Sequence, residues 1–317
     1  MVEGSGCCGR VLSRRDFLRL GGVGAAGLAL LPLAGCGGGG QSESAEGVPN
    51  PLIIGVIPSE DTGNVTEAFE PVANFVGEQL GVEAELYTAT DYSGIIEAMR
   101  SGEADVAWLG PLSYVLASQR ANAEAIAVQL TEEGSDKPTY KSFIITQADS
   151  DVQSLEDLRG KTFAFVDPTS TSGNLFPRQG FEEAGMDPDE DLAEATFAGG
   201  HDASALAVAN GDVDAGAVAS NTYESMVAEG VIEEGQVRII WESDPIPESP
   251  IAVRGDMPAE AKSRIKEVFV GMKPEDVGKE EISPDGAIGY VEAEDSDYDV
   301  IRDLAGTLGL KPEELAG

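Results

Sequence analysis

Basic residues are scarce in this chain: 20 Lys and Arg face 57 Asp and Glu, for a formal net charge of −37 at pH 7. Nucleic-acid backbones are bound by clustered Lys and Arg, so nucleic acid is excluded as a partner, as are anionic membrane surfaces. The acids are dispersed among 42% hydrophobic residues, which predicts a packed core beneath an acidic surface. Because molar salt screens self-repulsion, we expect a halophilic source.

Histidine is even scarcer, and this limits the chemistry that the chain can perform. His201 is the only histidine, so a metal site with several histidine ligands is impossible, and a Ser–His–Asp triad could be built only around this one residue. No Gly-x-Ser-x-Gly elbow, His-Glu-x-x-His pair or glycine-rich dinucleotide turn is present. We therefore expect a protein that is not an enzyme and needs neither a cofactor nor a metal ion.

The chain also lacks an apolar run long enough to form a stable membrane-spanning helix, which takes roughly 20 residues. Arg14 and Arg15 precede a shorter apolar stretch, Leu20 to Leu33. Paired arginines followed by such a stretch are typical of a removable export signal of the twin-arginine route. We predict a signal peptide over residues 1–35.

A cysteine stands directly after that stretch, in Leu33-Ala34-Gly35-Cys36, which resembles the lipobox of secreted lipoproteins. The resemblance implies that Cys36 is lipidated and anchors the protein to the outer face of the cell membrane; the alternative is a chance cysteine in a glycine-rich linker. Cys7 and Cys8 would be removed, which leaves no thiol for a disulfide. The mature chain would keep 16 basic and 55 acidic residues, a net charge of −39.

From Leu52 onward, short apolar runs alternate with longer amphipathic ones. We expect strands at residues 52–57, 82–87, 105–109, 125–130, 142–146, 162–166, 195–198, 215–219 and 238–241. We expect helices at residues 66–80, 95–101, 113–119, 173–184, 203–210 and 258–272. Such alternation predicts an α/β fold with mostly parallel sheets flanked by helices, and ligands at the C-terminal strand ends.

Two successive series of this kind predict two lobes of ordinary domain size. The first lobe is expected to comprise residues 51–145 and 242–317, and the second residues 146–241, joined by a two-strand hinge. Residues 36–50 are polar and glycine-rich, and are expected to form a flexible tether.

One run of hydroxyl residues occupies a favourable place for an anion: Ser170, Thr171 and Ser172 lie between a predicted buried strand and a predicted helix. The first N–H groups of a helix lack intrahelical partners and carry the positive end of its dipole, so anions bind there. The three hydroxyls would add donors without Arg or Lys. The alternative is simple helix capping.

Several short stretches resemble, in the same order, the phosphate, phosphite and phosphonate group of periplasmic binding proteins that serve ABC importers. The resemblance covers roughly residues 52–255. The stretches are ATDY (89–92), DVAWLGPLSY (105–114), LEDLRGK (155–161), DPTSTSG (167–173), GHDAS (200–204), GDVDAGAV (211–218) and IPESPI (246–251). The resemblance implies the type II periplasmic-binding-protein fold, whose two lobes close on a ligand.

The same resemblance assigns residues to the cleft. Tyr92 and Tyr114 would face the ligand from one lobe, and Ser170, Thr171 and Ser172 from the other. His201 would donate a ring N–H to an oxyanion. The alternatives are core packing for the two tyrosines, and an indirect or helix-capping role for His201.

Five further positions bear on the ligand. Asn221 and Glu224 are expected in a cleft-edge loop, either as ligand contacts or as exposed loop residues. Ser249 and Leu109 stand where similar proteins that take aminoalkylphosphonates have an acid and an aromatic residue. Without that acid, a buried ligand ammonium would be unpaired, which favours a small ligand without an amine; Asp244 is the neighbour that could supply a carboxylate instead.

The sequence therefore predicts a lipid-anchored, monomeric, extracytoplasmic protein that captures phosphate, phosphite or a small phosphonate for an ABC permease and its ATPase. The alternative is a binding protein that feeds a sensor or chemoreceptor. Both functions require the same capture of a small oxyanion, so the chain alone leaves them open.

Overall fold

The structure is a computed structural model, which describes residues 42–43, 47–131, 134–135, 137–278, 282 and 286–310. The expected signal peptide, Cys36 and much of the expected tether lie outside these residues. All described residues belong to one compact unit, Gln41–Gly317. Ordered structure begins before Pro51: β1 (Ser42–Glu43) pairs with β2 (Pro49–Asn50), and Val48 is buried in the apolar core.

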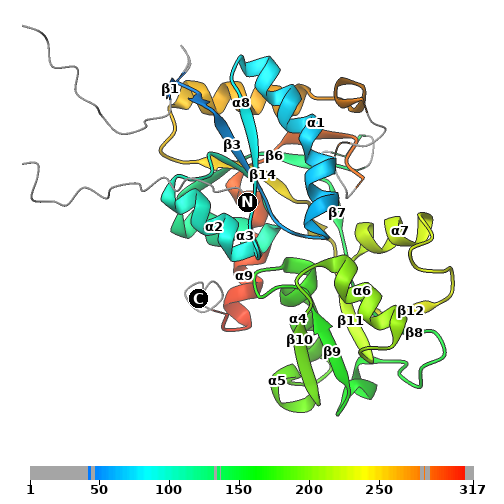
Figure 1. The fold of residues 1–317 in the computed structure, drawn as a ribbon. Coiled ribbons are helices and arrows are strands. Elements are labelled where there is room, and N and C mark those ends of the chain that lie inside the picture. The colour runs from blue at the N-terminus through cyan, green and yellow to red at the C-terminus, as the bar shows by residue number, and fades with distance from the viewer. Residues whose placement is uncertain are drawn as a thin grey trace, which may run out of the picture. The chain divides into compact units, whose positions relative to one another are not determined.

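The first of two main sheets has the strand order β15-β6-β14-β5-β3-β4 (Figure 1). Its strands are β3 (Leu52–Val56), β4 (Ala84–Thr88), β5 (Val106–Trp108), β6 (Ala123–Leu130), β14 (Pro250–Arg254) and β15 (Gly289–Glu292). Four helices pack on it, namely α1 (Thr62–Leu80), α2 (Tyr92–Ser101), α3 (Pro111–Arg120) and α8 (Ala259–Gly271). The helix α9 (Asp299–Thr307) packs against α3.

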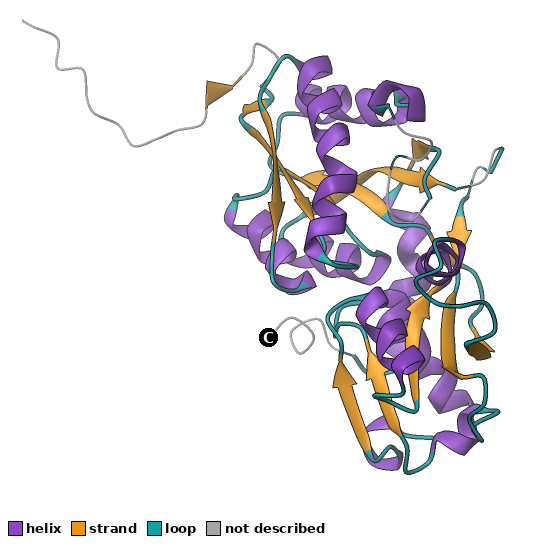
Figure 2. Ribbon diagram, turned by 45° about the vertical axis from the view of Figure 1, so that its right-hand side comes forward, coloured by secondary structure: helices purple, strands orange, loops and turns teal. Residues whose placement is uncertain are grey.

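The second main sheet has the order β10-β9-β11-β8-β12. Its strands are β8 (Ser142–Gln147), β9 (Thr162–Phe165), β10 (Glu194–Phe197), β11 (Ala215–Ala219) and β12 (Val237–Glu242). The helices α4 (Phe176–Glu183), α6 (His201–Asn210) and α7 (Ser220–Ala228) pack on it, and α5 (Pro188–Asp191) is a single turn. Figure 2 shows helices beside the strands of both sheets, as expected for an α/β fold.

The chain passes between the sheets twice, and the two passages pair with each other. The strand β7 (Thr139–Tyr140) is antiparallel to β13 (Ile246–Pro247), with Ile246 opposite Tyr140. This short ladder is the two-strand connection that the sequence predicts. All of β8 belongs to the second sheet, so the first passage is complete before Ser142.

The sheets are mixed, whereas the sequence predicts mostly parallel ones. In the first sheet β3 is parallel to β4 and β5, but β14 lies between β5 and β6 and runs antiparallel to both. In the second, β8 runs antiparallel to β11 and β12. The reason is that β8 and β14 are the strands by which the chain enters the second sheet and re-enters the first, and alternation along the sequence carries no signal for their direction.

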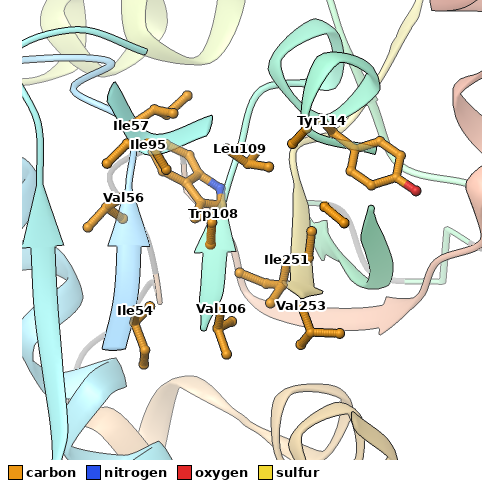
Figure 3. Close-up of a cluster of buried hydrophobic side chains, with 14 of the residues drawn as sticks. Ile54, Val56, Ile57, Ile95, Val106, Trp108, Leu109, Tyr114, Ile251 and Val253 are labelled. Atoms are coloured by element: carbon orange, nitrogen blue, oxygen red, sulfur yellow. The ribbon is translucent and has the colours of Figure 1, made fainter. Parts of the chain in front are cut away.

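The central strands are stabilised by burial of their apolar side chains, and the ends of helix α1 are set by the residues that cap it. The core side chains of the neighbouring strands β3, β5 and β14 lie side by side in the first sheet (Figure 3). Helix α1 begins at Thr62, four residues before the expected start, because the Asp61 carboxylate accepts the Gly63 N–H at 2.9 Å. It ends at Leu80, and the next residue, Gly81, has a φ of 68°, a conformation that glycine adopts without strain.

Candidate functional site

A small cavity lies where elements of the two main sheets meet, beyond the ends of β3, β5, β9 and β11. Its volume is about 20 Å³, so it admits only a compact group. The lining comprises Ile57, Ser59, Tyr92, Trp108, Gly110, Tyr140, Ser170, Thr171, Ser172, His201, Ala219, Asn221 and Ser249. Seven of the eight predicted ligand-binding residues are among them.

The lining is uncharged in a protein whose net charge is −37. None of these lining residues is Asp, Glu, Lys or Arg, whereas hydroxyl, amide, indole and imidazole groups are well represented. An anion would therefore meet hydrogen-bond donors and no carboxylate. A cation would find no negative partner there, and burying an unpaired charge is costly.

The hydroxyl run forms a tight turn between β9 and α4. Residues Thr171–Leu175 make a π-helical turn that continues into α4, and the Ser170 Oγ accepts the Gly173 N–H at 3.0 Å. Only glycine fits at position 173, because an added Cβ would lie 2.2 Å from the Val166 Cβ. Ser170 thus caps the turn, the alternative role considered above, and lines the cavity as well.

Two of the three hydroxyl oxygens already accept a backbone N–H. Besides Ser170, the Thr171 Oγ1 accepts the Leu112 N–H at 2.8 Å, from the first turn of α3. A hydroxyl has one donor and two acceptor positions. An oxygen that accepts from the protein keeps its proton to donate, so Ser170 and Thr171 each retain a hydroxyl donor at the cavity they line.

His201 is held in one tautomer by its surroundings. The Ala219 N–H donates to His201 Nδ1 at 3.0 Å. A backbone N–H can only donate, so Nδ1 is unprotonated and the ring proton is on Nε2. Burial lowers the pKa of His201 to about 3, so the ring is neutral near pH 7. Its Nε2 lies 3.5 Å from the Ser172 Oγ, at the cavity.

Asp167 orders the start of the turn without lining the cavity. Its Oδ1 accepts the Thr169 N–H at 2.7 Å and the Thr169 hydroxyl at 2.8 Å, and its Oδ2 lies 3.4 Å from the Tyr92 N. Burial raises the pKa of this carboxyl group. The Tyr92 contact links the turn to the N-terminus of α2, which brings Tyr92 to the cavity.

Elements of the two sheets are hydrogen-bonded to each other around the cavity. The His201 N–H donates to the Ser59 carbonyl at 2.7 Å, and the Asp61 N–H to the Asp202 Oδ2 at 3.0 Å. At Gly200 an added Cβ would lie 2.6 Å from Asp202 Oδ1, so a larger residue there would require the Asp202 side chain to move. The cavity is therefore lined from both sides.

Tyr114 is the predicted residue that the structure places outside the lining. Its hydroxyl donates to Asp295 Oδ1 at 2.7 Å and accepts the Ala125 N–H at 3.2 Å. Burial and the bond to Asp295 raise its pKa, and its ring packs on Tyr298. Figure 3 shows the hydroxyl pointing away from Trp108. The core role considered as the alternative is the one observed.

The remaining predicted positions divide as follows. Asn221 lines the cavity but lies in the first turn of α7, whereas the sequence predicts a loop; Glu224, one turn later, does not line it. Ser249 lines the cavity and Asp244 does not. Asp214 does not line the cavity either, and accepts the Thr162 N–H and hydroxyl at 2.8 and 2.9 Å.

Sequence reasoning missed three polar lining residues: Ser59, Trp108 and Tyr140. Ser59 follows the C-terminal end of β3, where ligands of α/β sheets gather, so its position could have identified it. Trp108 lies inside a stretch already recognised as similar to the family. Tyr140 is in β7, the passage between the sheets, and its approach to the cavity depends on the tertiary fold.

Within the described ranges, no group of three or more His, Cys, Asp and Glu side chains is placed to hold a metal ion. The helices in this part of the chain were also compared with the length and apolar character that crossing a membrane requires, and none meets both. The carboxyl-rich surface therefore contains no described metal cluster, and the cavity is the feature that brings the predicted site residues together.

Residues 54–298 match the protein family described as "ABC transporter, phosphonate, periplasmic substrate-binding protein". The phosphate-import protein PhnD of Mycolicibacterium smegmatis is 35% identical over 90% of this chain and 94% of its own. The phosphonates-binding periplasmic protein of Escherichia coli is 33% identical over 73% and 70%, respectively. The crystal structure of a binding protein component of an ABC phosphonate transporter from Pseudomonas aeruginosa superposes with a TM-score of 0.75, at 28% identity, covering 82% of this chain and 87% of that one.

Proposed function

We propose that this chain, which belongs to the family of periplasmic substrate-binding proteins of phosphonate ABC transporters, captures a phosphorus oxyanion in the cavity between its two main sheets. The chain is an extracytoplasmic substrate-binding protein and not an enzyme. The ligand we propose is phosphate, phosphite or a small phosphonate without an amine, taken up as a free ion and passed to a permease unchanged.

The observation that carries this proposal is the donor set of the lining. Ser170 and Thr171 keep hydroxyl protons to donate, and His201 is neutral with its proton on Nε2. Hydrogen bonds to an ionised acceptor are shorter and stronger than those between neutral groups. A lining without carboxylates accepts such an anion without like-charge repulsion at contact distance.

The proposed mechanism is capture followed by closure. The turn at Ser170–Ser172 and the residues of α6 and α7 belong to the second sheet, whereas Tyr92, Trp108 and Ser59 belong to the first. A ligand that bonds to donors from both sides favours the conformation in which the sheets approach, which is a population shift. The permease would then recognise the closed conformation.

Calorimetric titration in molar KCl tests the ligand, using phosphate, phosphite, methylphosphonate, 2-aminoethylphosphonate and sulfate with the chain from residue 47 onward. We expect one phosphorus oxyanion without an amine to bind with a micromolar or lower Kd. Binding of sulfate alone, or of none of the five, would contradict the proposal.

A double variant, Ser170→Ala with Thr171→Val, tests the turn. It removes two charge-assisted hydrogen bonds of about 1.5 to 3 kcal/mol each, so Kd should rise by several orders of magnitude. Ser154→Ala is the matched control, because it also removes a hydroxyl at the start of a helical turn, the 3₁₀ turn Leu155–Leu158, but Ser154 does not line the cavity. Equal Kd values for the double variant and the control would remove the turn from the site.

We also propose that Cys36 carries the lipid anchor, after export through the twin-arginine route. The support is the order of signals in the sequence: paired arginines, a short apolar stretch and a small-residue segment that ends at the cysteine. Cys36→Ser should shift the protein from the membrane fraction to the soluble extracytoplasmic fraction and leave ligand affinity unchanged. Retention of the variant on membranes would refute lipidation at Cys36.

A further inference from the structure

Two hydrogen-bond donors in the cavity lining have no partner among the residues that the structure describes: the Ser59 hydroxyl and the Trp108 indole N–H. Both side chains are buried, with exposed fractions of 4% for Ser59 and 1% for Trp108. Buried polar groups in native proteins are almost always paired, and an unpaired one lowers stability. Two such groups facing the same cavity call for a common explanation.

The backbone fixes both side chains in place. The Ser59 N–H donates to the Ile57 carbonyl at 2.9 Å, and the Ser59 carbonyl accepts the His201 N–H at 2.7 Å. The Ile57 N–H in turn lies 3.4 Å from the Trp108 carbonyl oxygen. The Trp108 ring packs on Phe69, with the ring centroids 4.9 Å apart. One turn at the end of β3 therefore holds the hydroxyl and adjoins the strand that carries the indole.

We infer that Ser59 and Trp108 bind the ligand, donating hydrogen bonds to its oxygen atoms from the first sheet. This inference rests on the proposed function. The oxygen atoms of a tetrahedral oxyanion point in divergent directions, so donors on one side cannot satisfy them all. Ser170, Thr171, Ser172 and His201 all belong to the second sheet and its connections, and the two unpaired donors supply the other side.

This assignment predicts effects of opposite sign on binding and on the stability of the ligand-free protein. Ser59→Ala removes an unpaired buried hydroxyl, so the ligand-free Tm should stay the same or rise. The same change removes a hydrogen bond to a charged ligand, so Kd should rise by about 10- to 100-fold. A hydroxyl that served only packing would change neither quantity in this way.

Thr222→Val is a matched control. The Thr222 hydroxyl is also buried and unpaired among the described residues, but Thr222 does not line the cavity. We expect this variant to bind with unchanged affinity. For the indole, Trp108→Phe removes the N–H together with part of the ring; replacement by 3-benzothienylalanine removes the N–H and keeps the bicyclic shape.

The experiment is titration of the wild type and these variants with inorganic phosphate and with methylphosphonate, alongside thermal unfolding without ligand. Weaker binding by Ser59→Ala and by the benzothienyl variant, with Thr222→Val unchanged, would support the inference. If the wild type binds either anion and one of these two variants binds it equally well, the assignment of that residue is overturned while the proposed function stands. If the wild type binds neither anion, the proposed function fails and the inference fails with it.

Discussion

Acidification should destabilise this protein through His201. The ring is buried, accepts the Ala219 N–H at Nδ1, and has its pKa lowered from 6.5 to about 3 by burial. Between these two pH values the unfolded chain binds a proton that the folded chain does not. The contribution of His201 to stability is therefore complete above pH 6.5 and is lost as the pH falls.

The magnitude at pH 5 follows from the unfolded-state value alone, because the folded-state pKa lies well below 5. One pKa unit corresponds to about 1.36 kcal/mol, so 1.5 units give a loss of about 2 kcal/mol between pH 7.5 and pH 5. Urea unfolding measures this at both pH values, with molar KCl present throughout to screen the many carboxylates.

The comparison protein is His201→Asn, which has no titrating group at this position. Its stability at pH 7.5 can differ from that of the wild type, since the ring is lost, but its decrease toward pH 5 should be smaller by about 2 kcal/mol. The carboxylates contribute equally to both proteins and cancel in the difference. An equal decrease in the two proteins would refute the assignment of a neutral, buried ring.

Three further outcomes follow from the structure. Gly173→Ala should destabilise the protein by at least about 1 to 3 kcal/mol in urea unfolding, because its Cβ would lie 2.2 Å from the Val166 Cβ; a neutral effect would contradict the tight turn. Tyr114→Phe should cost about 1 to 3 kcal/mol of stability, since it leaves the Ala125 N–H unpaired, and should leave Kd unchanged; a weaker Kd would return Tyr114 to the site. Anion affinity should be retained or improved from moderate to molar KCl, because salt screens the net charge of −37; a steady fall while circular dichroism stays constant would refute this.

The parts of the site that are continuous in sequence could be predicted from it. The run Ser170–Ser172 is flanked by a clear strand and a clear helix, and its glycine at 173 is the residue that the tight turn requires. His201 could be assigned because it is the only histidine and lies in the stretch GHDAS (200–204), which resembles the family. At these positions the local sequence determines the backbone conformation, and the backbone conformation in turn places the side chains at the cavity.

Other features depend on contacts between residues far apart in the chain. Tyr92 and Tyr114 are both tyrosines in stretches that resemble the family, so the sequence gives no reason to assign them different roles. In the structure, Asp295, 181 residues after Tyr114, accepts a hydrogen bond from the Tyr114 hydroxyl. The direction of β14 depends on how the chain returns from the second sheet. Both the Tyr114–Asp295 hydrogen bond and the direction of β14 depend on residues far apart in the chain. The periodicity of a segment of ten or twenty residues therefore could not predict either of them.

The neutral lining also bears on how a captured ion would leave. The attraction between two charges weakens in inverse proportion to distance, whereas that between a charge and a fixed dipole falls off more steeply. A site that contains Arg or Lys would still attract an anion after the sheets separate. Here the lining offers only hydroxyl, imidazole, indole and amide dipoles, so a small separation would end nearly all of the attraction. If the sheets close and open as proposed, such a site would retain the ion in the closed conformation and release it rapidly on opening, which suits repeated delivery.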